Sequence, residues 1–252
     1  LIPPDLMGKA VLVSREPGVL AGAAVGLAGF RRVDSELLTS ALLSDGAELA
    51  TGARIGTVEG RVASILKAAR TAVNFVQRLS GIATETSKYV AAVDGSRARI
   101  VDTRKTTPGW RAFEKYAVQC GGARNHRRGL DDLIMIKDNH LAALPGDNPV
   151  AGAVARAHEA APELKVEVEA DTLEQAEAAA KAGANIILLD NMPPEMLREA
   201  VALIDGRSQT EASGGITLDN IRAVAEAGVN YISVGALTHS AMAVDIAMDF
   251  SP

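Results

Sequence analysis

From residue 94 onward the chain alternates short apolar strands with helical stretches, and this rhythm constrains the fold more than any other feature of the sequence. The strand-like segments are RIVDT (99–103), LIMIK (133–137), KVEVEA (165–170), IILLD (186–190), QTEAS (209–213) and YISVGA (231–236). Helices expected at 173–183 and 219–228 each end at a glycine, as is typical of the C′ position. Six β/α units favour a parallel sheet, either doubly wound or barrel-like.

Polar and charged side chains collect at the C-terminal ends of these strands. They are Arg104, Lys105, Lys137, Glu169, Asp190 and Ser213. Because the active sites of α/β barrels lie at this face, the pattern favours a barrel-like arrangement over a doubly wound sheet.

The first part of the chain has a different pattern. Between residues 8 and 59, strand-like segments (GKAVLVSRE, EGRVASIL), a hairpin turn (SDGAE) and a helical segment (AGAAVGLAGFRRV) predict a small α+β domain. A helical pattern follows from residue 64 to about 93, and Gly81 is expected to break it. We therefore predict an N-terminal domain over residues 1–76 and a barrel domain over 77–252.

Positive charge is concentrated in one segment of an acidic chain. Residues 97–137 contain ten Lys or Arg against four Asp or Glu, whereas the whole chain has a formal charge of −5. A local cation cluster on an anionic body is typical of a pocket for a small polyanion, not of a nucleic-acid surface. For any single arginine, solvated surface charge is the alternative.

Composition excludes several other classes. The longest apolar runs are far shorter than the roughly 18 residues of a membrane span, and no signal segment opens the sequence. The single cysteine, Cys120, excludes an internal disulfide and a multi-thiolate metal site. We expect a cytoplasmic protein that binds neither membrane nor nucleic acid. Leu1 stands where an initiator Met would, so an N-terminal segment is expected to precede this numbering.

Carboxylates follow the strand alternation in KVEVEAD. Val166 and Val168 are expected to face the helices, while Glu167 and Glu169 point into the barrel. With Asp190, they could hold a Mg²⁺-bound substrate or hydrogen-bond sugar hydroxyls. The alternative is a salt-bridged interior, which we favour for Glu167 because it lies one layer deeper.

Two glycine-containing turns close the last two strands. They are Ser213–Gly215 and Val234–Ala236, and the second leads into Thr238, His239 and Ser240 at an expected helix start. Backbone N–H groups at such turns can bind phosphate, although glycines also serve as simple turns.

Two further side chains have competing interpretations. His126 has no His or Cys at metal-ligand spacing, so it is either a substrate-contacting or orienting group or a structural histidine. Lys137 could instead be the Schiff-base lysine of an aldolase-like barrel, but that reading leaves the surrounding arginines unexplained.

Seven ordered motifs give a family resemblance over essentially the whole chain. ARTAVNFVQRLSGIAT, DTRKTTPG, GGARNHRRGL, IKDNH, LLDN, EASGG and VGALTHS resemble the quinolinate phosphoribosyltransferases, the decarboxylating enzymes of NAD biosynthesis. The resemblance implies an α+β sandwich domain followed by an incomplete, six-stranded α/β barrel. It also implies the substrates quinolinate and phosphoribosyl pyrophosphate, the cofactor Mg²⁺, and a homodimer whose active sites are shared between subunits.

The resemblance also implies roles for individual residues. The quinolinate pocket would use Thr103, Arg104, Lys105, His126, Arg127 and Lys137, with Arg70 reaching in from the partner subunit. Glu169 and Asp190 would hold ribose hydroxyls and Mg²⁺, and the catalytic set would be Lys105, Lys137, Glu169 and Asp190. The 5′-phosphate would lie against Ser213, Gly214, Gly215, Val234, Gly235, Ala236 and His239.

Two alternative functions remain at this point. A related phosphoribosyltransferase could take another pyridine acid, but a substrate with one carboxylate would leave part of the Arg104, Lys105 and Arg127 set without a partner. A non-catalytic barrel that binds a phosphate ligand is the other, and the intact Lys137, Glu169 and Asp190 argue against it.

Overall fold

The structure is a computed structural model that describes residues 2–144 and 149–251. The chain divides into two compact units, the first made of residues 1–88, 106–123 and 236–252 and the second of 89–105 and 124–235. These units are interleaved along the chain, whereas the predicted domains, 1–76 and 77–252, are contiguous. The C-terminal residues belong to the first unit because they form a strand of its sheet.

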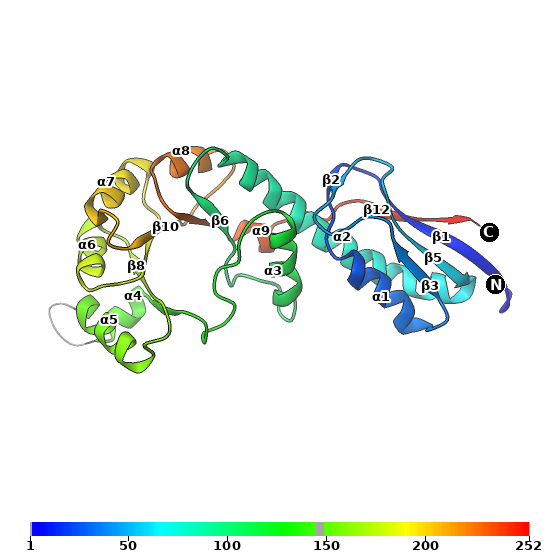
Figure 1. Ribbon diagram of the computed structural model, residues 1–252, viewed down its shortest axis with the longest axis horizontal. Coiled ribbons are helices and arrows are strands. Elements are labelled where there is room, and N and C mark those ends of the chain that lie inside the picture. Colours follow the sequence, from blue (N-terminus) through cyan, green and yellow to red (C-terminus); the bar gives the residue numbers. More distant parts are fainter. Residues whose placement is uncertain (1, 145–148, 252) are drawn as a thin grey trace. The chain divides into compact units, whose positions relative to one another are not determined.

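The first unit contains an antiparallel four-stranded sheet in the order β12-β1-β5-β3 (Figure 1). Its strands are β1 (Met7–Ser14), β3 (Leu38–Ala41), β5 (Arg54–Arg61) and β12 (Ile246–Ser251), and a separate pair joins β2 (Gly18–Val19) to β4 (Glu48–Leu49). The predicted SDGAE turn therefore does not form a hairpin, because β3 and β4 belong to different sheets. The predicted strand EGRVASIL is also only partly correct, since its residues from Val62 onward are helical.

Helices α1 (Ala23–Val33) and α2 (Val62–Ala92) supply the apolar side chains that pack with this sheet, and the shorter α3 (Arg111–Cys120) and α9 (Ala236–His239) complete the unit. Phe30 of α1, Ile65 and Val76 of α2, and Leu12 and Ile55 of the sheet are buried in one apolar cluster. The mixed α+β character predicted for this part is confirmed.

The prediction that Gly81 breaks the long helix is wrong. α2 runs without interruption over 31 residues, Val62–Ala92. A Cβ atom at Gly81 would lie 1.9 Å from the backbone oxygen of Met242 and 2.8 Å from its carbonyl carbon. Gly81 therefore permits a close approach of backbone to helix, which is a second reason for glycine besides a break.

We expect Gly81→Ala to destabilise the protein although alanine favours helix. The helix propensity gain is about 1 kcal/mol, but overpacking against a backbone oxygen costs ~1–3 kcal/mol or more. Gly152→Ala on α5 (Pro149–Ala160) is the matched control, because among the described residues nothing outside its own helix lies within 4 Å of its Cβ position. Urea unfolding followed by circular dichroism should give a lower midpoint for Gly81→Ala only; an equal or higher midpoint would contradict the close approach.

The second unit is a parallel sheet of six strands in the order β6-β11-β10-β9-β8-β7. The strands are β6 (Arg99–Val101), β7 (Ile134–Ile136), β8 (Val166–Ala170), β9 (Ile186–Asp190), β10 (Gln209–Ser213) and β11 (Tyr231–Ser233). Each of the six predicted strands is confirmed. β6 and β7 occupy the two edges of the order, so the barrel is incomplete, as the resemblance implied.

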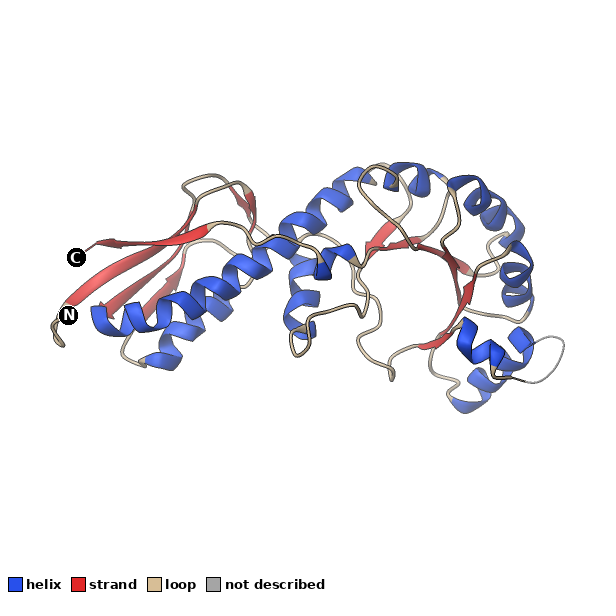
Figure 2. Cartoon of the chain, turned by 180° about the vertical axis from the view of Figure 1, so that it is seen from behind, coloured by secondary structure: helices blue, strands red, loops and turns tan. Residues whose placement is uncertain are grey.

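Helices cover the outer face of this curved sheet (Figure 2). They are α4 (Asp138–Ala142), α5, α6 (Leu173–Lys181), α7 (Pro194–Ile204) and α8 (Ile221–Glu226). In α6, particular residues fix where the helix begins and ends. Thr172 accepts a hydrogen bond from the Gln175 N–H, the Gln175 side chain accepts one from the Thr172 N–H, and Gly183 follows the helix with φ +84°.

No helix in the described part of the chain is long and apolar enough to cross a membrane.

Candidate active site

Strand register brings the polar strand ends of the second unit together. Ile136 of β7 pairs with Val168 of β8, so the next residues, Lys137 and Glu169, are neighbours and form an ion pair. One strand further, Asp190 of β9 pairs with Ser213 of β10. The charged residues predicted at the C-terminal strand ends therefore lie together along one edge of the sheet.

A cavity of about 350 Å³ opens at this edge. Nine predicted site residues line it, namely Thr103, Arg104, Lys105, His126, Arg127, Lys137, Glu169, Asp190 and Ser213. Residues from 103 to 213 along the sequence thus meet in one site, within the second unit alone.

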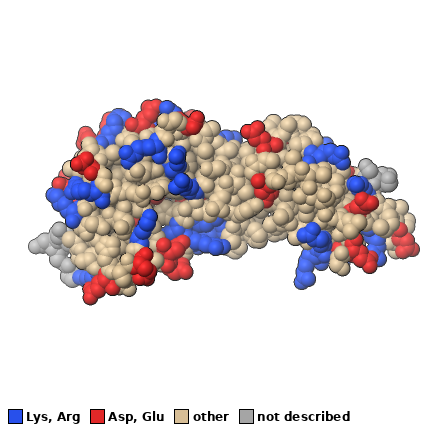
Figure 3. All heavy atoms as spheres, viewed as in Figure 1, with Lys and Arg blue, Asp and Glu red and all other residues tan. Residues whose placement is uncertain are grey.

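The cavity brings cationic side chains close together. Burial and the nearby Arg104 charge lower the pKa of the Arg127 guanidinium, while Glu167 and Asp132 act in the opposite direction. Arg127 Nη1 lies 3.4 Å from the Leu133 carbonyl oxygen, and the Thr103 hydroxyl accepts the Lys105 N–H at 3.0 Å. In Figure 3, Lys and Arg side chains gather over the barrel unit, at the left of the view. Two guanidinium groups that repel each other in a partly buried site favour a bound anion.

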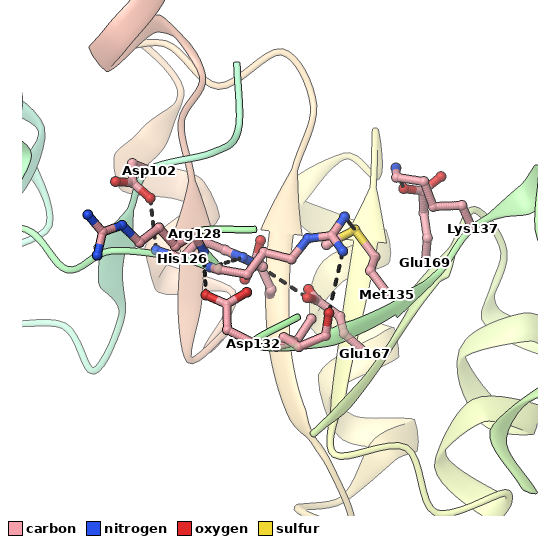
Figure 4. A network of polar contacts seen from close by, with 11 residues as sticks. Asp102, His126, Arg128, Asp132, Met135, Lys137, Glu167 and Glu169 are labelled. Carbon is pink, nitrogen blue, oxygen red and sulfur yellow. Dashed lines mark hydrogen bonds and ion pairs between the residues drawn. The ribbon is translucent and has the colours of Figure 1, made fainter. Parts of the chain in front are cut away.

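His126 lies in a network of buried acids (Figure 4). Its backbone N–H donates to Asp102 at 2.8 Å, and its Nε2 atom lies 3.1 Å from Glu167 and 3.3 Å from Glu211. Burial lowers the pKa of His126, but the hydrogen bonds and charges of Glu167 and Glu211 outweigh burial and raise it to about 10. Burial also raises the pKa of Glu167, against the effect of His126. The interpretation of Glu167 as part of the polar interior agrees with these contacts, and the contact with His126 is an ion pair only when the ring is protonated.

Glu169 and Asp190 are the carboxylates that line the cavity from neighbouring strands. The Glu169 side chain is 12% exposed and pairs with Lys137, and Asp190 accepts a hydrogen bond from the Asn191 side chain at 2.7 Å. Both offer the oxygen ligands that Mg²⁺ prefers, in a space where substrate oxygens could complete its coordination.

The turn after β10 has the conformation that only glycine adopts readily. Gly214 and Gly215 have φ of +88° and +61°, and a Cβ atom at Gly214 would lie 2.1 Å from the Asn191 side-chain oxygen. After β11, the Val234 N–H already donates to the Val101 carbonyl at 3.0 Å. Val234 therefore extends the sheet and does not offer this N–H to a phosphate.

Three predicted residues belong to the first unit. α9 begins at Ala236 and ends at His239, so Thr238 to Ser240 do not stand at a helix start as expected. The His239 ring lies 2.7 Å from the Ser240 hydroxyl, and Arg70 is exposed on α2. The roles of Arg70, Ala236 and His239 stay predictions.

Four residues that line the cavity were not predicted. They are Met135, Leu188, Glu211 and Ser233. The first three lie two positions before Lys137, Asp190 and Ser213, so strand alternation places each pair on the same face. The same alternation that predicts an inward Glu167 in β8 therefore also predicts these positions in β7, β9 and β10.

The barrel and its charged cavity define an α/β-barrel enzyme that acts on a small, multiply charged anion. Two family models match the chain in succession. "Quinolinate phosphoribosyl transferase, N-terminal domain" matches residues 1–80, and "Quinolinate phosphoribosyl transferase, C-terminal domain" matches residues 82–249. The chain therefore belongs to the quinolinate phosphoribosyl transferase family.

Curated relatives and solved structures agree with this family. The chain is 45% identical over 242 residues to "Probable nicotinate-nucleotide pyrophosphorylase [carboxylating]" of Bacillus subtilis, covering 96% of this chain and 83% of that protein. It is 44% identical to "Nicotinate-nucleotide pyrophosphorylase [carboxylating]" of Mycobacterium leprae, covering 98% and 88%. The crystal structure of NadC from Streptococcus pyogenes superposes with a TM-score of 0.94 at 43% identity, covering 99% of this chain and 88% of that one.

Proposed function

We propose that this enzyme transfers the phosphoribosyl group of phosphoribosyl pyrophosphate to quinolinate and releases CO₂ and pyrophosphate, leaving nicotinate mononucleotide. One observation carries the proposal beyond family membership. Four cationic side chains, Arg104, Lys105, Arg127 and Lys137, line the same cavity as the carboxylates Glu169 and Asp190.

The cations suit quinolinate, which carries carboxylates on adjacent ring carbons. A guanidinium group can bind a carboxylate through two parallel hydrogen bonds, and this geometry also sets the plane of the pyridine ring. Arg104 lies close enough to Arg127 for its charge to lower the pKa of the Arg127 guanidinium. A substrate with a single carboxylate would neutralise only part of this set.

Transfer needs positioning and charge stabilisation but no covalent nucleophile. When pyrophosphate leaves, C1′ of the ribose acquires oxocarbenium character, and the pyridine nitrogen attacks it. Glu169 and Asp190 would orient the ribose hydroxyls, and Lys105 and Lys137, together with the two arginines, would bind the negative charge that the two substrates bring. When Mg²⁺ is bound, Glu169 and Asp190 would hold it, and it would neutralise charge on the departing pyrophosphate.

Loss of CO₂ follows from the first step. Once the ring nitrogen carries the ribose, the pyridinium accepts the electron pair that the C2 carboxylate leaves behind, and a proton then takes the position of that carboxylate. A partly buried cavity favours this loss because it removes water from the C2 carboxylate.

The 5′-phosphate would lie at the glycine turns. Ser213, Gly214 and Gly215 offer a hydroxyl and consecutive N–H groups at a strand end of the cavity, and Gly235 lies at the end of the next strand. His239 and Ala236 are proposed as further contacts by family resemblance alone.

We also propose a homodimer in which Arg70 of one subunit completes the pocket of the other. This assembly rests on the resemblance described above. We propose a cytoplasmic location because the single cysteine fits a reducing compartment.

An assay for pyrophosphate release distinguishes the proposed enzyme from a non-catalytic barrel that only binds a phosphate ligand. With quinolinate, phosphoribosyl pyrophosphate and Mg²⁺ present, we expect continuous pyrophosphate release that stops when EDTA is added and resumes with excess Mg²⁺. Omitting quinolinate is the control. No release above that control, while phosphoribosyl pyrophosphate still binds in calorimetry, would favour the non-catalytic barrel.

A further inference from the structure

His126, Glu167 and Glu211 form a buried cluster beside the cavity. Glu167 is fully buried on β8 and Glu211 is 2% exposed on β10, so two strands on either side of β9 supply the acids. His126 comes from the segment before β7, and its Nε2 atom contacts one oxygen of each acid. Within residues 2–144 and 149–251, both oxygens of Glu167 and Oε1 of Glu211 have no well-aligned hydrogen-bond partner, although His126 Nε2 lies 3.1 Å from Glu167. Such burial is costly unless the imidazole partner is held in place.

The second ring nitrogen shows which atom of the imidazole carries the proton. The Arg127 N–H donates to His126 Nδ1 at 2.7 Å, so Nδ1 uses its lone pair as an acceptor. Glu167 and Glu211 raise the pKa of the ring to about 10 and would by themselves favour a ring protonated on both nitrogens, but that shift does not include the hydrogen bond at Nδ1. A proton on Nδ1 would, however, lie between atoms only 2.7 Å apart that already share the Arg127 hydrogen. The hydrogen bond from the Arg127 N–H to Nδ1 therefore indicates a neutral ring with its proton on Nε2.

A metal ion at this cluster is excluded by the same hydrogen bond. The ligand atoms of His126, Glu167 and Glu211 lie within 4.8 Å of one another, a spacing that could suit a cation. A neutral imidazole has one lone pair, however, and here it accepts the Arg127 N–H. Nε2 carries the proton and has no lone pair for a metal.

Other charged groups surround the cluster from several elements. Asp102 at the end of β6 accepts the His126 N–H, Asp132 accepts the Arg128 N–H, and Arg127 lies next in sequence. The remaining titratable side chains that line the cavity are Arg104, Lys105, Lys137, Glu169 and Asp190. Through Asp102, Glu167 and Glu211, the backbone and ring of His126 are held on three sides. Through Nδ1, the ring in turn holds the backbone of Arg127.

We propose that Glu167 and Glu211 are positioning residues that hold His126 as a neutral Nε2–H ring, and that this ring fixes the backbone of Arg127 for binding the anionic substrate. His126 is then a wall of the cavity and an orienting group, and the cationic side chains alone bind the substrate carboxylates. This inference rests on the proposed function only in naming quinolinate as that substrate.

Nitrogen NMR of the full chain labelled with ¹⁵N-histidine tests the ring state directly. We expect His126, assigned by its loss in His126→Ala, to show a protonated Nε2 and an unprotonated Nδ1 at neutral pH. In the double variant Glu167→Ala/Glu211→Ala this tautomer preference should be lost. A wild-type ring protonated at Nδ1, as an imidazolium or as the other tautomer, would overturn the proposal.

Kinetics separate positioning from a general structural role. The double alanine variant should raise KM for quinolinate by at least about tenfold, equivalent to about 1.4 kcal/mol, while KM for phosphoribosyl pyrophosphate stays within about twofold. The single variants Glu167→Gln and Glu211→Gln keep an acceptor oxygen and should restore KM for quinolinate to within about threefold of wild type. Glu199→Ala, at an exposed position on α7, is the control.

The two readouts also distinguish this inference from the proposed function. The NMR spectrum needs no substrate, so a chain that fails to turn over quinolinate could still show the Nε2–H ring. If the double alanine variant does not fold, the wild-type spectrum and the glutamine variants still decide. Equal rises of KM for both substrates in the glutamine variants would contradict the positioning role.

Discussion

Replacing Arg127 by alanine is expected to lower kcat/KM for quinolinate by between roughly 30-fold and several thousandfold, equivalent to about 2–5 kcal/mol. The physical reason is that a partly buried charge pair loses one partner, and the substrate carboxylate remains desolvated. Arg127 lines the cavity, and burial and the Arg104 charge lower its pKa. A bound anion would offset both effects. We expect an effect of similar size for Arg104→Ala.

Arg198→Ala is the control for the arginine variants. Arg198 lies on α7 of the same unit, half exposed, and pairs with Glu195 three residues earlier. Exposed pairs of this kind contribute about 0–1 kcal/mol, so activity should stay near that of the wild type. Steady-state kinetics at varied quinolinate concentration provide the comparison. A change below twofold in Arg127→Ala would mean that Arg127 does not bind the substrate.

Mixing two inactive variants is expected to restore activity if the pocket is shared between subunits. Arg70 is exposed on α2, and Arg127 lines the cavity of the barrel unit. In an Arg70→Ala homodimer, or in an Arg127→Ala homodimer, every site would lack one cation. After subunit exchange, about half of the dimers are heterodimers, each with one intact site and one doubly altered site. About a quarter of all sites should therefore recover.

Subunit exchange must be confirmed separately, for example by copurification of an untagged variant with a tagged one. Each variant mixed with itself is the control. If exchange occurs and activity stays at the level of the separate variants, Arg70 acts within its own chain or has no part in the site. A chain that stays monomeric in sedimentation would contradict the shared pocket directly.

The barrel unit could be predicted because its signals are local. Each strand is a short apolar run, and the residues that follow it lie at one edge of a parallel sheet. Lys137, Glu169 and Asp190 meet at this edge because the strand register places the ends of β7, β8 and β9 side by side. Alternation also predicted that Glu167 points inward, and its contact with His126 agrees.

Other parts of the site depend on contacts between distant segments, which local patterns do not encode. Glu211 lies 85 positions after His126, and nothing in the sequence shows that they meet at 3.3 Å. The Val234 N–H could be expected to bind phosphate until its hydrogen bond to Val101 of β6 is known. In these cases strand order, which is a property of the whole sheet, decides the partner.

The first unit was harder to predict for the same reason. β12 was not predicted, and it forms the sheet edge by pairing with β1 from the other end of the chain, as in Lys9 with Ser251. Gly81 looked like a helix break, because the close approach of Met242 is a tertiary contact. Helix propensity is a weak guide where packing decides.

The most direct test of the proposed reaction uses quinolinate labelled with ¹³C in the C2 carboxylate. We expect one labelled CO₂ for each pyrophosphate released, together with unlabelled nicotinate mononucleotide, and we expect nicotinate to be a far poorer substrate. Pyrophosphate release without labelled CO₂, or faster turnover of nicotinate than of quinolinate, would contradict the account.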